Sequence, residues 1–225
     1  MLVTGGAGFI GRSLIRRLLA EGYETVLLVE GSGEVEPVIP DQLVAYGQLI
    51  QTYFGDLRDR DLIGELIRKS NPDSVIHLAA AGVADPFLDY KAAIEHNVVG
   101  TINLVHSFFE ARLERQHAGQ LIVARTPGET SNMNVYAASK AAAWAFCSMY
   151  AQTKGWPITG AVIYQAYGPG QPDHTFVTAA MKAALAGTDL QMTSGVQQRD
   201  WIYVDDVADG FIAALKSDLA PGFSF

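Results

Sequence analysis

The stretch that decides the fold is Gly5-Gly6-Ala7-Gly8-Phe9-Ile10-Gly11. Before it stands Leu2-Val3-Thr4, a short apolar run that is typical of a buried strand. After it, residues 9–21 carry apolar side chains at helical spacing, and Gly22 follows where a helix would end. A glycine pattern between a strand and a helix predicts a turn that binds the pyrophosphate of a dinucleotide.

Each glycine of this pattern has its own physical reason. Gly5 would permit the tight turn, Gly8 would let the backbone approach a phosphate, and Gly11 would let the helix pack close to the strand. The first N–H groups of the helix and its partial positive charge would face the same phosphate. The alternative is a tight turn that binds nothing, and the glycines alone do not exclude it.

Strands and helices alternate along most of the chain. Apolar runs predict further strands at 25–29, 51–54, 74–78, 120–124, 158–164 and 200–204. Helical spacing predicts helices at 59–69, 90–115, 134–154, 175–186 and 207–216. Residues 31–47 are rich in Gly, Pro, Glu and Asp and are predicted to form a loop with one helical turn. This order predicts an α/β fold with a doubly wound, Rossmann-like parallel sheet.

We expect this fold to be divided into two parts. Residues 1–164 would form the NAD-binding domain, and residues 165–225 a small, incomplete substrate-binding region interleaved with the last elements of the sheet. Met1 begins the first strand almost at once, which predicts that no signal peptide is present. Residues 220–225 are typical of a turn that enters another strand, so we expect the sequence to be part of a longer chain.

The composition narrows the classes of partner. Hydrophobic residues make up 49% of the chain and charged residues 18%, and the formal net charge is −8. This negative charge argues against nucleic-acid binding, which needs a basic surface. No apolar stretch is long enough for a membrane span, so we expect no membrane association and a cytoplasmic location.

Several reactive residue types are interpreted as structural. Cys147, the only cysteine, lies in an apolar helical pattern and is expected in the core. His77 ends a strand and is expected to be packed and hydrogen-bonded, and the other histidines lack metal-ligand spacing, so no metal is expected. Asp205-Asp206 is interpreted as the opening of a helix, an N-cap followed by a first-turn acid.

Glu30 is the candidate that chooses between dinucleotides. It ends the second predicted strand, where a carboxylate can accept hydrogen bonds from both hydroxyls of an adenosine ribose and would repel a 2′-phosphate. No Arg or Lys follows it until Arg58, so no partner for a 2′-phosphate is close in sequence. Glu30 therefore favours NAD over NADP. The alternative is a surface glutamate at a strand end.

Further motifs follow the glycine turn in a fixed order. They are Gly55-Asp56-Leu57, His77-Leu78-Ala79-Ala80, Asn97-Val98-Val99-Gly100-Thr101, Tyr136-Ala137-Ala138-Ser139-Lys140, Tyr167-Gly168-Pro169-Gly170 and Arg199-Asp200-Trp201-Ile202-Tyr203-Val204-Asp205-Asp206-Val207. With these motifs the chain resembles the extended short-chain dehydrogenase/reductases, specifically the nucleotide-sugar epimerases and dehydratases. The resemblance covers essentially the whole chain and is far more specific for the family than for the substrate.

The resemblance implies a role for each matching position. Asp56 and Leu57 would hold the adenine, and Lys140 would bond the nicotinamide ribose. Arg199 would contact the diphosphate of the substrate, and Gln165 would offer an amide to it. The other positions implied to contact NAD are Gly5, Gly8, Phe9, Ile10, Gly11, Glu30, Leu78, Ala79, Ala80, Asn97, Tyr136 and Tyr164. The family also implies a homodimer through the helices predicted at 90–115 and 134–154.

Tyr136 and Lys140 are the candidate proton-transfer pair. They stand four residues apart on a predicted helix and so share one face. A free tyrosine, with a pKa near 10, is a poor base at neutral pH. A nearby ammonium group and a positive nicotinamide ring would lower this pKa, so that Tyr136 could take a proton from a sugar hydroxyl. On its own, a Tyr-x-x-x-Lys spacing is often a structural accident.

Thr126 is the candidate for the third catalytic group. The family places a serine or threonine hydroxyl at the end of the fifth strand, and Thr126 matches that position. However, only residues 127–135 separate it from Tyr136, where the family has a much longer loop. Either residues are missing from the sequence between Ala124 and Asn132, or the loop is truly short and the hydroxyl is displaced. The unusual composition of residues 124–129 favours the first possibility.

Two classes of function remain open. The first is an NAD-dependent enzyme that acts on a nucleotide-diphosphate sugar, with a 4-epimerase preferred to a 4,6-dehydratase or a decarboxylase. No Asp-Glu pair follows Thr126, as it often does in the dehydratases, and Glu129 is out of step with it. The second is a catalytically weak NAD-binding sensor or scaffold, which the unusual end of the fifth strand favours. Val162 and Gln165 also depart from the family, which often has Arg and Asn there.

Overall fold

A computed structural model describes residues 1–31, 41–83, 85, 87–113 and 119–225. Two predictions fall partly beyond this range. Residues 32–40 of the predicted loop and residues 114–115 of the predicted helix at 90–115 lie outside the described residues. The described part of the loop contains the one expected helical turn, α2 (Asp41–Val44).

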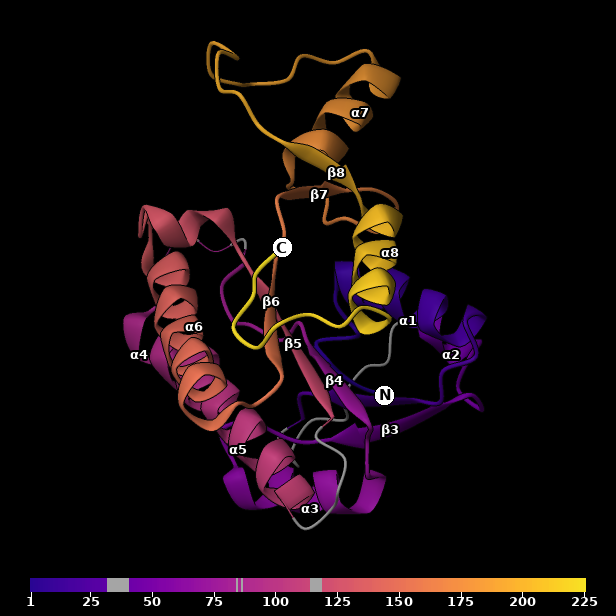
Figure 1. Ribbon diagram of the computed structural model, residues 1–225. Helices are drawn as coiled ribbons and strands as arrows, with labels where there is room; N and C mark the ends of the chain where they lie inside the picture. Colours follow the sequence, from indigo (N-terminus) through magenta and orange to yellow (C-terminus); the bar gives the residue numbers. More distant parts are fainter. Residues whose placement is uncertain (32–40, 84, 86, 114–118) are drawn as a thin grey trace.

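A six-stranded parallel sheet forms the centre of the molecule (Figure 1). In spatial order, its strands are β3 (Ile50–Phe54), β2 (Thr25–Val29), β1 (Leu2–Thr4), β4 (Ser74–His77), β5 (Gln120–Arg125) and β6 (Ile158–Val162). The strand order reverses between β1 and β4, and in such sheets ligands bind at this point, beyond the carboxyl ends of the strands. The predicted Rossmann-like fold is confirmed.

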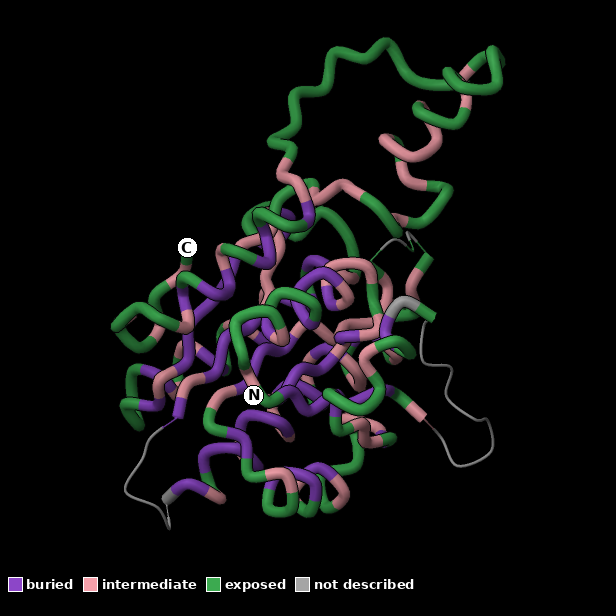
Figure 2. Tube along the Cα trace, turned by 90° about the vertical axis from the view of Figure 1, so that its right-hand side faces the viewer, coloured by how far each residue is buried: buried purple, intermediate pink, exposed green. Residues whose placement is uncertain are grey.

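Helices cover both faces of this sheet, because the strands alternate their apolar side chains between two cores. Leu2, like its neighbours on that face, packs against α3 (Arg60–Ser70), α5 (Gly100–Leu113) and α6 (Val135–Lys154). Val3 points to the other core, where α1 (Phe9–Ala20) and α8 (Val204–Leu215) lie. Figure 2 shows the sheet as the most buried part of the chain.

The helix predicted at 90–115 contains a π-helical segment. It begins as α4 (Tyr90–Ala93), continues as the π-helical η1 (Ile94–Val99) and becomes α5 at Gly100. Short π-helical segments often occur at functional sites, because the extra residue redirects a side chain. Here η1 carries Asn97 and His96, both of which contact other elements of the candidate site.

The C-terminal region adds a second, two-stranded sheet. The strand predicted at 158–164 ends at Val162, and β7 (Gln165–Tyr167) instead pairs with β8 (Trp201–Tyr203). Between them, α7 (Phe176–Ala186) has no buried residue, and Figure 2 shows α7 and the exposed segment after it projecting from the body.

The last helix and the last residues both return to the main sheet. α8 begins at Val204, three residues before its predicted start, with Tyr203 as its N-cap. The predicted N-cap role of the Asp205-Asp206 pair is therefore wrong, but both acids lie in the first turn, as expected, near the positive end of the helix dipole. Beyond α8, the Gly160 N–H donates to the Phe223 carbonyl at 2.9 Å, so the chain end lies beside β6. The division into domains 1–164 and 165–225 stays a prediction.

No helix among the described residues is long and apolar enough to cross a membrane. The cytoplasmic location stays a prediction. Within the same range, no group of three or more His, Cys, Asp or Glu residues is arranged to hold a metal ion.

Candidate active site

The glycine turn closes against the segment that follows β4. Gly5 has a φ of +71°, and a Cβ built on it would lie 2.5 Å from the Ala79 nitrogen. A Cβ on Gly11 would lie 2.4 Å from the Gly5 carbonyl oxygen. Gly5 and Gly11 are therefore required by close backbone approach, as the sequence predicted.

The N-terminus of α1 is suited to an anion. Its N-cap is Gly8, which offers no side chain to bond the first N–H groups, and no acidic residue lies in the first turn. These N–H groups and the helix dipole would attract a phosphate. Gly5 and Gly11 keep the turn tight against its neighbours, and the uncapped helix start beside them is suited to the pyrophosphate of a dinucleotide.

His77 is a structural histidine at the end of β4. It is 1% exposed, its Nδ1 lies 2.7 Å from Thr4 Oγ1, and its Nε2 lies 2.9 Å from Thr101 Oγ1. Burial lowers its pKa to about 3, so the imidazole is neutral at physiological pH. The prediction of a packed, hydrogen-bonded histidine is confirmed.

Asn97 joins the segment after β4 to α6. Its Oδ1 accepts from the Ala81 N–H at 2.7 Å, and its Nδ2 donates to the Ala81 carbonyl at 3.0 Å and to Ser139 Oγ at 2.9 Å. Ser139 Oγ in turn donates to the Tyr136 carbonyl at 2.7 Å. The chain Asn97–Ser139 therefore fixes the helix turn that carries Tyr136. The expected contact of Asn97 with the cofactor stays a prediction, as do the expected contacts of Leu78, Ala79 and Ala80.

The Tyr136–Lys140 pair lies at the start of α6. The helix begins there because Asn134 caps it, accepting a hydrogen bond from the Ala137 N–H at 2.8 Å. Lys140 is 3% exposed, and burial lowers its pKa to about 8. The predicted helix and the shared face are therefore present.

The pKa of Tyr136 moves in the direction opposite to the expected one. Burial, and then the negative charge of Glu129, raise it to about 12. Burial disfavours the charged phenolate, and a nearby carboxylate repels it. The lowering expected from Lys140 is thus not a property of the polypeptide alone.

Thr126 lies in a tight turn at the end of β5. It is the N-cap of the 3-10 helix η2 (Pro127–Thr130), and its Oγ1 accepts from the Gly128 N–H at 3.4 Å. The two alternatives for this segment, missing residues or a truly short loop, both stay predictions. No hydrogen bond joins Thr126 to Tyr136 within the described part of the chain. Its catalytic role stays a prediction.

Residues that sequence reasoning had not placed in the site surround this turn. Glu129 is 6% exposed, and its Oε2 accepts from Arg125 Nε at 2.9 Å and from Arg125 Nη2 at 2.7 Å. The signal was visible, because a threonine followed by proline and, three residues after the threonine, by glutamate is a capping-box sequence.

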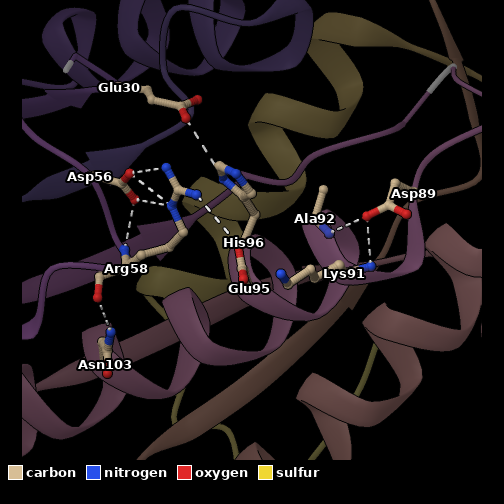
Figure 3. A network of polar contacts seen from close by, with 9 residues as sticks. All are labelled: Glu30, Asp56, Arg58, Asp89, Lys91, Ala92, Glu95, His96 and Asn103. Atoms are coloured by element: carbon tan, nitrogen blue, oxygen red, sulfur yellow. Dashed lines mark hydrogen bonds and ion pairs between the residues drawn. The ribbon is translucent and has the colours of Figure 1, made fainter.

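Glu30 and Asp56 lie together beyond the ends of β2 and β3 (Figure 3). Arg58 holds the Asp56 carboxylate, with Nη2 at 2.5 Å from Oδ2, and this lowers the pKa of Asp56. His96 Nδ1 lies 3.7 Å from Glu30 Oε1. Arg58 lies near enough to Glu30 for their charges to interact, so a basic group is close to Glu30 in the fold although none is close in sequence.

An open depression of about 510 Å³ lies beside this group. It is lined by Asp56, Arg58, Asp59, Glu95 and Val99. Leu57, the second predicted adenine contact, has its carbonyl bonded to Asn103 Nδ2 at 3.0 Å. The structure therefore brings together Glu30, Asp56 and Leu57.

The predicted substrate residues lie at the pairing of β7 with β8. Gln165 begins β7, and its N–H donates to the Asp200 carbonyl at 3.0 Å. Asp200 follows Arg199 directly in the sequence, so Gln165 lies close to the backbone of Arg199. Arg199 is exposed, and its Nη1 donates to the Gln198 carbonyl at 2.8 Å. Tyr164 is 49% exposed just before Gln165. The substrate contacts of Gln165 and Arg199 and the NAD contact of Tyr164 stay predictions.

The chain matches known proteins over nearly its whole length. A family model described as the NAD dependent epimerase/dehydratase family matches residues 1–222. The UDP-glucose 4-epimerase of Mycolicibacterium smegmatis is 30% identical in an alignment 233 positions long, which covers 95% of this chain and 72% of that protein. The dTDP-glucose 4,6-dehydratase of Xanthomonas campestris pv. campestris is 29% identical in an alignment 244 positions long, which covers 98% of this chain and 68% of that protein.

A solved structure gives the same result. The dTDP-glucose 4,6-dehydratase of Streptomyces venezuelae, with NAD bound, superposes with a TM-score of 0.80 at 26% identity. The superposition covers 100% of this chain and 74% of that one. NAD is therefore the cofactor of the family, and its members are enzymes of the extended short-chain dehydrogenase/reductase type. The chain belongs to the NAD dependent epimerase/dehydratase family.

Proposed function

We propose that the protein is a 4-epimerase of a nucleotide-diphosphate sugar, acting through a transient 4-keto sugar. The observation that carries this proposal is the pair of half-buried Tyr136 and buried Lys140 at the start of α6, tied by Ser139 and Asn97 to the segment against which the glycine turn closes. This arrangement supports a proton acceptor next to a dinucleotide.

The residues divide the work of such a reaction. NAD, when bound, supplies the acceptor for the hydride from sugar C4 and later its donor. Tyr136 accepts the proton of the C4 hydroxyl through its phenolate oxygen and returns it after the ring has turned over. Lys140 stabilises that phenolate and bonds the nicotinamide ribose, and Thr126 donates a hydrogen bond to the same sugar oxygen.

The surroundings of Glu129 support an epimerase over a dehydratase. Elimination of water from the 4-keto sugar needs a base for one proton and an acid for the leaving hydroxyl. Glu129 is the carboxylate next to the pair, but both of its oxygens are engaged, by Arg125 and by the Thr126 N–H at 3.0 Å. An epimerase needs no such group.

A small substrate panel tests the proposal. The protein is incubated separately with UDP-glucose, with dTDP-glucose and with UDP-glucuronic acid, and the products are identified by proton NMR. Formation of the 4-epimer supports the proposal. A 4-keto-6-deoxy sugar would instead establish the dehydratase, and loss of a carboxyl group from a uronic-acid substrate the decarboxylase.

A catalytically weak NAD-binding protein is the second candidate. It is favoured by the hydroxyl of Thr126, which caps η2 and forms no described bond to Tyr136. Its signature is tight NAD binding with no product from any nucleotide sugar, although one of them raises the melting temperature.

Glu30→Ala is expected to lower the affinity for NAD about tenfold, because the ribose hydroxyls lose a charged acceptor. The affinity for NADP should fall less, since the repulsion of a 2′-phosphate is also removed. Titration calorimetry with both dinucleotides measures this. Glu24→Ala, an exposed acid just before the start of β2, is the matched control. Equal losses for both dinucleotides would contradict the assignment.

We propose that the protein forms a homodimer through α4, η1 and α6. These elements expose large apolar side chains, among them Tyr90 at 67%, Ile94 at 50% and Phe146 at 43%. Phe146→Glu is expected to convert the dimer to a monomer, because a charge would be buried without a partner. Light scattering after size-exclusion chromatography measures the mass. Leu185→Glu on α7 is the control and should leave a dimer, and a monomeric unchanged protein would refute the proposal.

A further inference from the structure

A buried ion pair closes the turn between β5 and α6. Arg125 is the last residue of β5, and Glu129 lies in η2, with its side chain only 3% exposed. Two guanidinium nitrogens bond one carboxylate oxygen, and the Thr126 N–H bonds the other. Charge-assisted bonds to both oxygens hold the carboxylate in one position.

The surroundings of Arg125 are shaped to hold this side chain. The Trp144 ring of α6 lies 4.4 Å from its guanidinium carbon, and Arg125 Nη1 donates to Ser224 Oγ at 2.7 Å. A Cβ on Gly160 of β6 would lie 2.6 Å from Arg125 Cδ, so only glycine leaves room. Residues from α6, β6 and the chain end therefore converge on Arg125.

The turn that carries Glu129 is seated on the first turn of α6. A Cβ on Gly128 would lie 3.3 Å from the Ala137 Cβ and 3.1 Å from the Met133 sulfur, so the backbone approaches closely there. Ala137 follows Tyr136 directly. The carboxylate is thus fixed with respect to the Tyr136–Lys140 pair from both sides, by Arg125 and by this contact.

The charges around the pair come from four elements. They are Arg125 of β5, Glu129 of η2, Lys140 and Cys147 of α6, and His77 of β4. Burial keeps His77 neutral and raises the pKa of the Cys147 thiol to about 12, so neither carries a charge near neutral pH. Glu129 is the anion that raises the pKa of Tyr136, and it also raises the pKa of Lys140. It therefore acts on both members.

We propose that Glu129, fixed by Arg125, is a positioning residue whose negative charge disfavours the Tyr136 phenolate and favours the Lys140 ammonium in the free protein. The described bonds of the carboxylate go to Arg125 and to the Thr126 N–H, so it acts on Tyr136 through its fixed negative charge. The pair Arg125–Glu129 thereby contributes, together with burial, to the pH at which Tyr136 ionises.

The ionisation of Tyr136 can be measured without turnover. In protein labelled with ¹³C at the tyrosine ζ carbon, the resonance that is absent from Tyr136→Phe belongs to Tyr136, and its shift is followed against pH. In Glu129→Gln, the midpoint is expected to fall by on the order of one pH unit, because a nearby negative charge is lost. Glu65→Gln, an exposed glutamate of α3, is the control and should leave the midpoint unchanged.

Two further variants keep the test decisive. Glu129→Asp retains the charge and should restore most of the midpoint, which a purely structural role of the side chain would not predict. Glu129→Gln alone leaves the guanidinium of Arg125 without its partner, which could prevent folding. The double variant Arg125→Met with Glu129→Gln removes both charges and serves if the single variant does not fold. A Tyr136 midpoint within a few tenths of a unit of the unchanged protein in the folded variants would overturn the proposal.

The effect on turnover rests on the proposed function. If Tyr136 is the base, the acidic limb of the rate profile should move to lower pH in Glu129→Gln by the same amount as the NMR midpoint. A shifted midpoint without any turnover of nucleotide sugars would refute the proposed function and leave the role of Glu129 intact. An unshifted midpoint with normal turnover would refute the role of Glu129 and leave the proposed function intact.

Discussion

Tyr136→Phe is expected to lower turnover of the nucleotide sugar by about 10³-fold, within the range that a positioned acid or base contributes. The substitution removes only the hydroxyl, and the remaining ring still fills the same largely buried space at the start of α6. NAD affinity and the melting temperature should therefore stay close to those of the unchanged protein. Stopped assays of the product and calorimetry with NAD measure the two halves of this expectation.

The matched control for this substitution lies on the same helix. Tyr150 packs edge-on against His106, and Tyr150→Phe keeps that ring contact while it removes a hydroxyl far from the glycine turn. Its turnover should be unchanged. Full activity of Tyr136→Phe would remove the proton-transfer mechanism, whereas loss of NAD binding in this variant would assign Tyr136 to the cofactor site instead.

The pH dependence follows from the direction of the two pKa shifts. The free protein holds Tyr136 protonated, since its pKa is raised to about 12, and it holds Lys140 near its point of deprotonation, at about 8. Activity should therefore rise with pH through the neutral range, because the active form requires the phenolate. An acidic optimum would contradict the assigned base.

The main sheet could be predicted because its signals are local. Thr25–Val29 is an example of a five-residue apolar run. When such runs alternate with helical segments along a chain, they are typical of strands buried in a parallel sheet. The boundary at Val162 could not be predicted, because β7 has only three residues and is defined by its pairing with Trp201 to Tyr203, far along the chain. Such a strand has no periodicity of its own.

The parts of the candidate site that could be predicted are those where the backbone geometry accepts only one type of residue. Gly5 and Gly11 are examples, since only glycine fits the observed approach of backbone atoms. Ser139 escaped prediction, because its role comes from a hydrogen bond to Asn97, 42 residues away. The direction in which the pKa of Tyr136 is shifted could not be predicted either. It depends on burial and on the charge of Glu129, and the spacing of residues in the sequence reports neither.

Gly11→Ala is expected to abolish NAD binding at millimolar NAD and to destabilise the fold by about 2 kcal/mol, as overpacking does. Alanine is the better helix former, so helix propensity alone would predict stabilisation. Sterics decide against it, because the new Cβ would lie 2.4 Å from both the Gly5 carbonyl oxygen and the Gly6 Cα, which are backbone atoms that cannot rotate away. Relief requires the glycine turn to move away from α1.

Gly210→Ala separates the two effects within the same protein. Gly210 also lies inside a helix, α8, but a Cβ there would meet no atom within 4 Å. This control should therefore gain about 0.5 to 1 kcal/mol and bind NAD normally. Chemical denaturation and NAD calorimetry on both variants form the measurement. If Gly11→Ala kept NAD affinity and gained stability like Gly210→Ala, the turn would not depend on close backbone approach, and its assignment as the pyrophosphate cradle would fail.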